Sequence, residues 1–268
     1  MYGARYRRQK TGIRDQKDKP MASLLEEFEI HPMSEPMFSI GGYEIMFTNS
    51  ALYMLLAVGA GTLLMTLAMR PRALVPGRWQ MVAETLYNFA ADMVEGAAGE
   101  KAKPFFPFIF SIFIFVLFCN LFGMLPNSLA VTSHVFINLA LALFLFIIIT
   151  IVGFARHGLH FLTLFVPAGV PKAMLPFLVV IEFLSFAVRP FSLAIRLFAN
   201  MLAGHILLQV FAGMTVSLLA AGWLAGLGIL PLAANIAITG FEFFVALVQA
   251  YVYAFLAAIY LRDALEMH

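Results

Sequence analysis

An apolar run over residues 174–218 limits what this chain can fold into more than any other stretch. As one helix it would be roughly 65 Å long, whereas the hydrocarbon core of a bilayer is only about 30 Å thick. The run carries these polar and charged side chains: Glu182, Ser185, Arg189, Ser192, Arg196, Asn200, His205 and Gln209. At about 100° per residue, those from Glu182 to Asn200 fall on one narrow stripe, and His205 falls on the opposite face. A charge at membrane depth costs about 2.5–3.5 kcal/mol on insertion scales, so the stripe indicates an ion path or a bound partner.

The Arg189-Pro190 pair interrupts this run, and two interpretations are open there. Proline removes a backbone donor and disrupts an interior helix, so the run could break at this point. A break would leave residues 174–188, which are too few to cross a bilayer, and a continuous kinked helix is therefore the favoured prediction. The last apolar stretch, residues 232–261, would be roughly 45 Å long as a helix. Neither helix can stand upright in the bilayer, so we expect both to be tilted.

The whole sequence is 62% hydrophobic and only 12% charged, against about 25% charged in an average soluble domain. Further apolar runs of membrane length cover residues 49–69, 105–124 and 135–154. Residues 76–100 instead repeat apolar side chains every three or four positions between acidic ones, which predicts an amphipathic helix. The predicted fold class is an all-α integral membrane protein with about five membrane-embedded helices plus one amphipathic helix, the last two membrane helices forming a long, tilted hairpin.

The chain divides into three parts by composition. Residues 1–20 are polar and basic and are predicted to be a disordered tail, residues 21–48 an N-terminal surface segment with a short amphipathic helix over 22–30, and residues 49–268 the membrane domain. Alternation of the spans places all eight loop Lys and Arg residues beyond residue 49 on one side, which the positive-inside rule makes cytoplasmic. The basic tail would then lie outside, so one hypothesis is that translation begins at Met21.

The polar groups within the spans have a plain interpretation and a functional one. Single polar residues often join membrane helices by hydrogen bonds, and this remains the alternative for Ser185, Ser192 and Gln209. Arg196 fits it less well, because a guanidinium stays charged and small residues around it let another helix approach. We therefore expect Arg196 to present a fixed positive charge to a partner helix.

On the last helix, Glu242 and Gln249 are seven positions apart and share a face. Glu242 and His205, on facing helices, are a candidate proton relay, and a hydrogen-bonded core histidine is the alternative for His205. Cys119 lies in an apolar run and is expected to serve packing. The sequence has no phosphate-binding glycine motif and no closed set of metal ligands. We expect no cofactor, no metal, no nucleic-acid partner and no catalysis by this chain alone.

Residues 189–205 read RPFSLAIRLFANMLAGH, and residues 242–253 read EFFVALVQAYVY. Both segments resemble the signatures of subunit a of F-type ATP synthases, and the likeness extends from about residue 30 to the end of the chain. The resemblance implies that Arg196 faces the ionisable carboxylates of a rotating c-ring, with Asn200 and Gln249 on its flanks. It implies one half-channel on the cytoplasmic side, lined by Glu182, Ser185 and Ser192, and an opposite one lined by His205 and Glu242.

Two positions depart from the commoner bacterial pattern of that family. The acid and the histidine at positions 205 and 242 are exchanged, as in mitochondrial and alphaproteobacterial members. Gly123 stands where an acidic residue is often found near the end of the second span, so no channel role is implied there.

The function implied by the resemblance is that of a proton-conducting stator subunit of ATP synthase, with two offset half-channels against the c-ring. Its partners would be the c-ring, the b subunits of the peripheral stalk and the lipid bilayer, and protons would be the transported ion. The expected location is a bacterial inner membrane, crossed several times, with the mitochondrial inner membrane as the alternative. The alternative function is a subunit of another proton-coupled transporter or redox-driven pump, which inverted repeats or a bound quinone or haem would favour.

Overall fold

The computed structural model of the chain describes residues 32–33, 38–40, 43–70, 76–125, 128, 130–166 and 174–266. The predicted tail over 1–20 and the helix expected over 22–30 lie outside these residues. The described part contains α3 (Asn49–Ala68), α4 (Arg78–Ala98), α5 (Phe106–Gly123), α6 (Val135–His157), α7 (Leu175–Ala220) and α8 (Ile229–Leu265). Five of these, all except α4, belong to segments long and apolar enough to cross a membrane. The predicted all-α membrane fold is confirmed.

Short elements connect the helices. They are β1 (Phe38–Ile40), β2 (Tyr43–Ile45), and the 3-10 turns η2 (Glu100–Phe105), η3 (Val131–Ser133), η4 (Gly158–Phe165) and η5 (Gly222–Gly228). The two strands pair antiparallel, with Ser39 opposite Glu44. The sequence did not predict this hairpin, because three residues per strand are too few to show a period of two.

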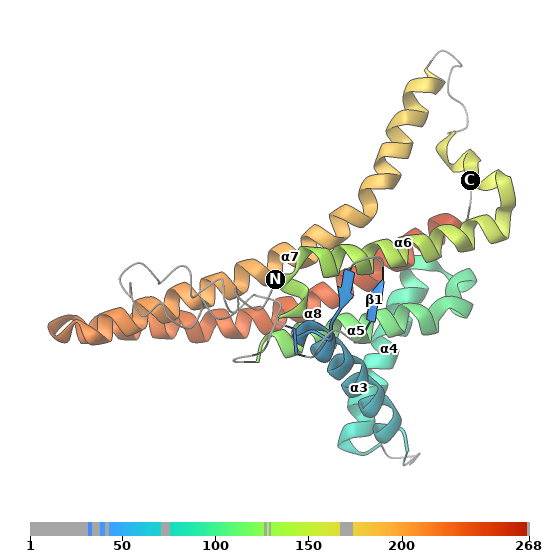
Figure 1. Ribbon diagram of the computed structural model, residues 1–268. Coiled ribbons are helices and arrows are strands. Elements are labelled where there is room, and N and C mark those ends of the chain that lie inside the picture. Colours follow the sequence, from blue (N-terminus) through green and yellow to red (C-terminus); the bar gives the residue numbers. More distant parts are fainter. Residues whose placement is uncertain are drawn as a thin grey trace.

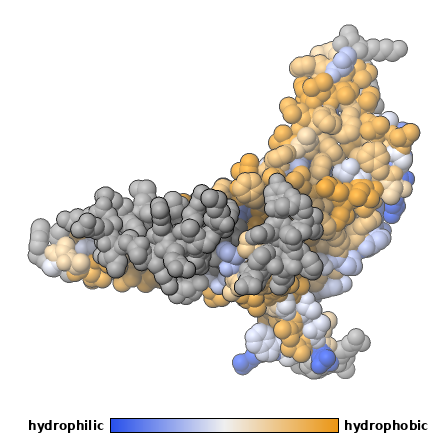
Figure 2. All heavy atoms as spheres, in the orientation of Figure 1, coloured by the Kyte–Doolittle hydropathy of each residue, from blue (hydrophilic) through white to orange (hydrophobic). Residues whose placement is uncertain are grey.

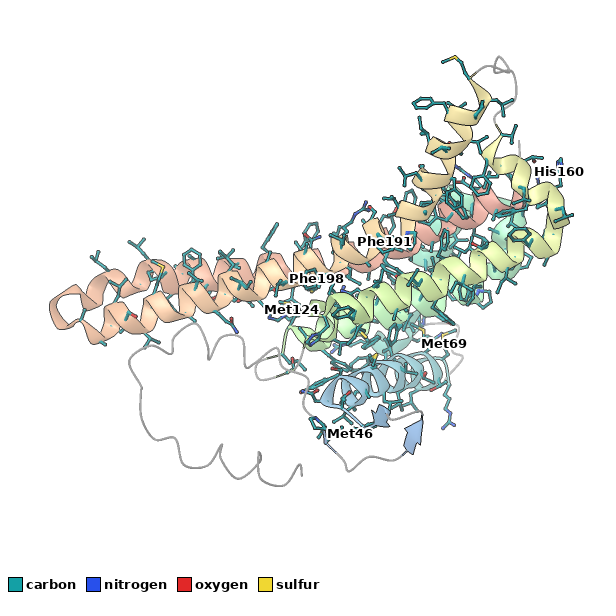
Figure 3. The ribbon with its side chains drawn as sticks, turned by 45° about the horizontal axis from the view of Figure 1, so that its top comes forward. Met46, Met69, Met124, His160, Phe191 and Phe198 are labelled. Carbon is teal, nitrogen blue, oxygen red and sulfur yellow. The ribbon has the colours of Figure 1, made fainter. Side chains whose placement is uncertain are left out.

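Helix α7 is one continuous helix that bends near its proline. Pro190 lies inside it and is buried. Figure 1 shows the N-terminal part of α7 turning away from α8, and Figure 3 places Phe191 beside the bend. Proline lacks the N–H that would complete the helical hydrogen-bond ladder, which accounts for a kink at this position. The prediction of a kinked continuous helix is confirmed, and the alternative of a break is wrong.

Beyond the bend, α7 and α8 run side by side as a long hairpin whose turn is η5 (Figure 1). The turn begins at Gly222, whose φ of 64° lies in the left-handed region that favours glycine. The predicted hairpin of the last two helices is confirmed. Their tilt relative to a membrane stays a prediction.

Small side chains hold the C-terminal half of α8 in the centre of the bundle. Five alanines of α8 are completely or almost completely buried: Ala246, Ala250, Ala254, Ala257 and Ala258. Small residues let helix backbones approach closely, and α5 packs directly on this part of α8. Figure 2 shows the opposite composition outside, where apolar residues cover the upper, bent arm and hydrophilic ones gather at the lower tip and the right edge. An apolar exterior suits contact with lipid.

Helix α4 is amphipathic, and large apolar side chains lie on its exposed face. Its buried face is made of small or slender residues such as Ala83, Ala90 and Val94, which pack against the bundle. Large apolar side chains, among them Trp79 and Tyr87, are exposed. These exposed side chains suit the membrane interface, as the sequence pattern predicts.

Candidate functional site

The polar stripe predicted on α7 lies largely on the exposed side of that helix. Ser185, Ser192 and Arg196 are exposed, whereas Glu182 and Asn200 are half-buried. Figure 3 marks this part of α7 with Phe191 at the bend and Phe198 two turns further along. The structure therefore keeps the stripe together on one helix and leaves most of it open to a neighbour outside the chain.

Arg196 points away from the core of its own chain. Leu193, Ala194 and Leu197, on the other side of the helix, are buried. Arg196 forms no ion pair with any described residue, so none of these residues neutralises its charge. Of the small residues expected around Arg196, Ala199 is exposed and Ala194 is buried in the core. The exposed group leaves room for a partner helix at the guanidinium.

Glu242 lies inside the α7–α8 hairpin instead. It is 3% exposed, and its carboxylate packs on Gly204 of α7. A Cβ atom at position 204 would lie 2.7 Å from Cδ of Glu242, so the glycine provides the space that the acid occupies. Neither carboxylate oxygen has a hydrogen-bond partner among the described residues. A buried acid without partners is costly, which makes it a candidate for exchanging a proton.

His205, the next residue of α7, lies against the end of α5. Its Nε2 would be 3.9 Å from a Cβ atom at Gly123. The same Cβ atom would lie 3.1 Å from Cβ of Ala130, so the glycine allows Ala130 to pack closely at this end of α5. Glu242 and Gly204 therefore lie between α8 and α7, and His205 lies beside the end of α5.

Asparagines from α5 and α6 add to the buried polar groups around this meeting point. Asn120, which is 0% exposed, donates its amide to the backbone oxygen of Ala246 at 3.0 Å, one turn beyond Glu242. Asn138, which is also buried, donates to the backbone oxygen of Thr132 at 2.6 Å. Burial lowers the pKa of His134, which precedes α6, so its neutral form is favoured. The sequence analysis missed both asparagines, although an amide in an otherwise apolar span is the signal that marks them.

The cytoplasmic end of the stripe carries the second arginine. Arg189 Nη1 lies 3.2 Å from Oδ2 of Asp263 on α8, and both side chains are largely buried. Arg189 and Arg196 are two turns apart on one helix. Within the described part of the chain, Arg189 is paired and Arg196 is not.

Gln249, on α8, is half-buried, as is Asn200 on α7. These two helices pack on each other, but the structure places no hydrogen bond between the two amides and Arg196 among the described residues. The flanking arrangement that the resemblance implies for Asn200 and Gln249 stays a prediction.

Comparison with known proteins decides the family. The model of the family described as ATP synthase A chain matches residues 51–262. The chain belongs to the ATP synthase A chain family. A protein of Methylobacterium sp. (strain 4-46) named ATP synthase subunit a is 52% identical over 242 residues, which are 90% of this chain and 96% of that protein. One of Afipia carboxidovorans with the same name is 51% identical over 247 residues, or 92% of this chain and 99% of its own length. One of Pelagibacter ubique (strain HTCC1062) is 47% identical over 245 residues, or 91% and 98%.

This member of the ATP synthase A chain family is a multi-pass membrane protein. In the described part of this family member, no three His, Cys, Asp or Glu side chains are grouped so that they could hold a metal ion. His157 and His160, at the end of α6 and the start of η4, are not part of such a group. Cys119 is buried in the core between neighbouring helices, as expected for a packing residue.

Proposed function

We propose that the chain is the proton-conducting stator subunit of the membrane sector of an F-type ATP synthase, and that it forms two offset half-channels against a rotating c-ring. The contrast between Arg196 and Glu242 carries the proposal. Arg196 is exposed and forms no ion pair within the described residues, so it is a fixed charge available to a partner. Glu242 is buried with both oxygens lacking hydrogen bonds there, so it is a group that can accept or release a proton inside the chain.

The mechanism follows from electrostatics. A continuous water path would short-circuit the membrane, so the two half-channels must end at different places. A proton enters one of them and neutralises a rotor carboxylate, and the neutral site can then turn into lipid. A site arriving from the other side meets Arg196, whose charge favours the ionised carboxylate, and the proton leaves by the second half-channel. Each charge that crosses is worth about 2.3 kcal/mol per 100 mV of membrane potential.

The residues of the two half-channels follow from their positions along the helices. The cytoplasmic half-channel comprises Glu182, Ser185 and Ser192, the opposite one His205 and Glu242, and Asn200 and Gln249 flank Arg196. The stripe begins on α7 near the end marked by Lys172 in the sequence, whereas Glu242 follows the outer turn between α7 and α8. The half-buried and exposed polar atoms of the stripe support a path open to water on that side.

The proposal includes the partners and the location. The partners are the c-ring, the b subunits of the peripheral stalk and the surrounding lipid, and protons are the transported ion. The location is a bacterial inner membrane, which is supported by the five membrane-length helices and by the bacterial origin of the relatives.

Replacing the exposed arginine tests the proposal. We expect Arg196→Ala to abolish ATP-driven proton pumping in inverted membrane vesicles while the complex still assembles, because Arg189, the other cation of the stripe, is already paired with Asp263. Arg156→Ala, which removes an exposed arginine at the end of α6, is the matched control and should pump normally. Near-normal pumping by Arg196→Ala would remove the central assignment. Co-isolation of the chain with a ring of small hairpin proteins separates the rotary function from that of another proton-coupled transporter.

A further inference from the structure

Two arginines of α7 lie on nearly the same face but in different surroundings. Arg189 and Arg196 are seven positions apart, which corresponds to about 10 Å along the helix and an angle of about 20°. Arg196 is exposed and unpaired within the described residues. The side chain of Arg189 is 19% exposed and forms an ion pair with Asp263. Both charges belong to the same polar stripe, so their different pairing and exposure need an explanation.

Aromatic rings hold the paired arginine in place. The guanidinium carbon of Arg189 lies 5.5 Å from the ring centroid of Phe186 and 5.1 Å from that of Tyr260. Both distances are within the range of a cation–π interaction. Tyr260 is three residues before Asp263 on α8, so one end of α8 supplies both the ring and the carboxylate that contact Arg189. Arg196 lies two turns further along α7.

Contacts from the opposite side fix the end of α8. Arg262 donates from Nη1 to the backbone oxygen of Ala97 at 3.2 Å, and Lys101 Nζ lies 3.3 Å from Oε1 of Glu266. Arg262 also approaches Asp263, at 3.7 Å from Oδ1, but its side chain is 45% exposed. Because α4 and η2 hold the residues on either side of Asp263, this carboxylate cannot move far from α7. Its charge therefore stays close to α7.

We infer, on the basis of the proposed function, that Arg189 is a positioning residue: it holds Asp263 and so keeps Arg196 free of any carboxylate of its own chain. A guanidinium that is already paired with an internal carboxylate attracts a second, rotor carboxylate much less. If Arg189 lost its charge, Asp263 would keep only the longer and more exposed contact with Arg262, and the other cation on the stripe is Arg196. The ion pair thus protects the function of a residue that it does not touch.

A purely structural role for the same ion pair makes a different prediction about double variants. If Arg189 and Asp263 only tie α7 to α8, removing either partner should harm the protein, and removing both should not help. If Arg189 sequesters Asp263, the harm done by Arg189→Gln should disappear when the freed carboxylate is also removed. Neighbouring residues that act through one interaction show such non-additive effects.

The experiment measures ATP-driven proton pumping by the whole complex in inverted vesicles. We expect Arg189→Gln to reduce pumping by about fivefold or more, and the Arg189→Gln/Asp263→Asn double variant to return to within about twofold of wild type. Asp263→Asn alone should also stay within about twofold, because it leaves Arg196 free. Arg189→Gln/Glu266→Gln is the matched control: it removes a nearby acid that is paired with Lys101, and it should not restore pumping.

Each other outcome overturns the inference. An assembled double variant as inactive as Arg189→Gln would show that Asp263 is not the cause of the loss. An inactive Asp263→Asn would show that Asp263 itself is needed. If Arg189→Gln does not assemble and the double variant does not assemble either, the arginine serves the fold and not Arg196. Failure of this rescue while Arg196→Ala abolishes pumping refutes only the present inference, whereas normal pumping by Arg196→Ala refutes the proposed function.

Discussion

Asp263 and Glu242, two acids on α8 that contact α7, have opposite surroundings. Asp263, near the bend of α7, is paired with Arg189 at 3.2 Å and held from the other side by contacts of its neighbours with α4 and η2. Glu242, about six turns earlier on α8, is more deeply buried, and its oxygens have no hydrogen-bond partner among the described residues. An ion pair occupies the oxygens of a carboxylate, whereas a carboxylate without partners has them available for a proton. The difference favours a fixed ion pair at Asp263 and proton exchange at Glu242.

The same comparison shows what keeps an unfavourable group in position. Burying a polar group without partners costs free energy, and no hydrogen bond from a described residue offsets that cost for Glu242. Its position comes from packing: Gly204 gives it space, and Asn120 of α5 binds the α8 backbone one turn further on. Packing therefore holds Glu242 in place and leaves its oxygens available for a proton. An ion pair would occupy these oxygens.

The largest expected effect comes from neutralising Glu242 without changing its shape. Glu242→Gln should lower ATP-driven proton pumping by about tenfold or more, because an ionisable group inside a membrane protein usually serves transport. Asp263→Asn is the matched change at the other acid, where we expect pumping within about twofold of wild type. The measurement is the initial pumping rate in inverted vesicles, normalised to the amount of assembled complex. Equal losses in the two variants would break the comparison.

A smaller effect should follow from closing the space beside Glu242. Gly204→Ala places a methyl group 2.7 Å from Cδ of the acid, and such overpacking usually costs about 1–3 kcal/mol. We expect a lower thermal midpoint of the purified complex together with a lower pumping rate, because the carboxylate must move. Gly213→Ala on the same helix is the matched control, since a Cβ atom there would meet nothing within 4 Å. Similar results for both variants would show that the glycine at 204 matters only for helix propensity.

Much of this arrangement could be predicted from the sequence. Apolar runs and the three- to four-residue period located the spans and α4 to within a few residues, because each of these helices is set by its own composition. The kink at Pro190 followed from local chemistry and from length, since residues 174–188 alone could not cross a bilayer. The hairpin of α7 and α8 followed from two long apolar segments separated by a glycine-rich break.

The pairing of particular side chains could not be predicted in this way. The helical wheel put Arg189 and Arg196 on one stripe, but only the packing of the end of α8 decides that one is paired and the other is open. Asp263 stood beside Arg262 after the last apolar helix and looked like an ordinary polar helix end. Asn120 gave a signal in the sequence, yet its contact with α8 depends on how α5 crosses that helix. The β1–β2 hairpin was too short for any periodic signal.

The smallest expected effect concerns the exposed ion pair that lies next to the buried one. Lys101 and Glu266 are 3.3 Å apart, but their side chains are 66% and 36% exposed, and exposed pairs contribute only about 0–1 kcal/mol. We therefore expect Lys101→Ala to change the thermal midpoint of the purified complex little, and the difference to shrink further at high salt, where surface charges are screened. Arg262→Ala is the comparison variant, because it removes the bond to the backbone of Ala97 that also holds this end of α8. A loss in Lys101→Ala as large as that in Gly204→Ala would mean that a solvent-exposed pair, rather than the contacts of Arg189 and Arg262, keeps Asp263 in its place.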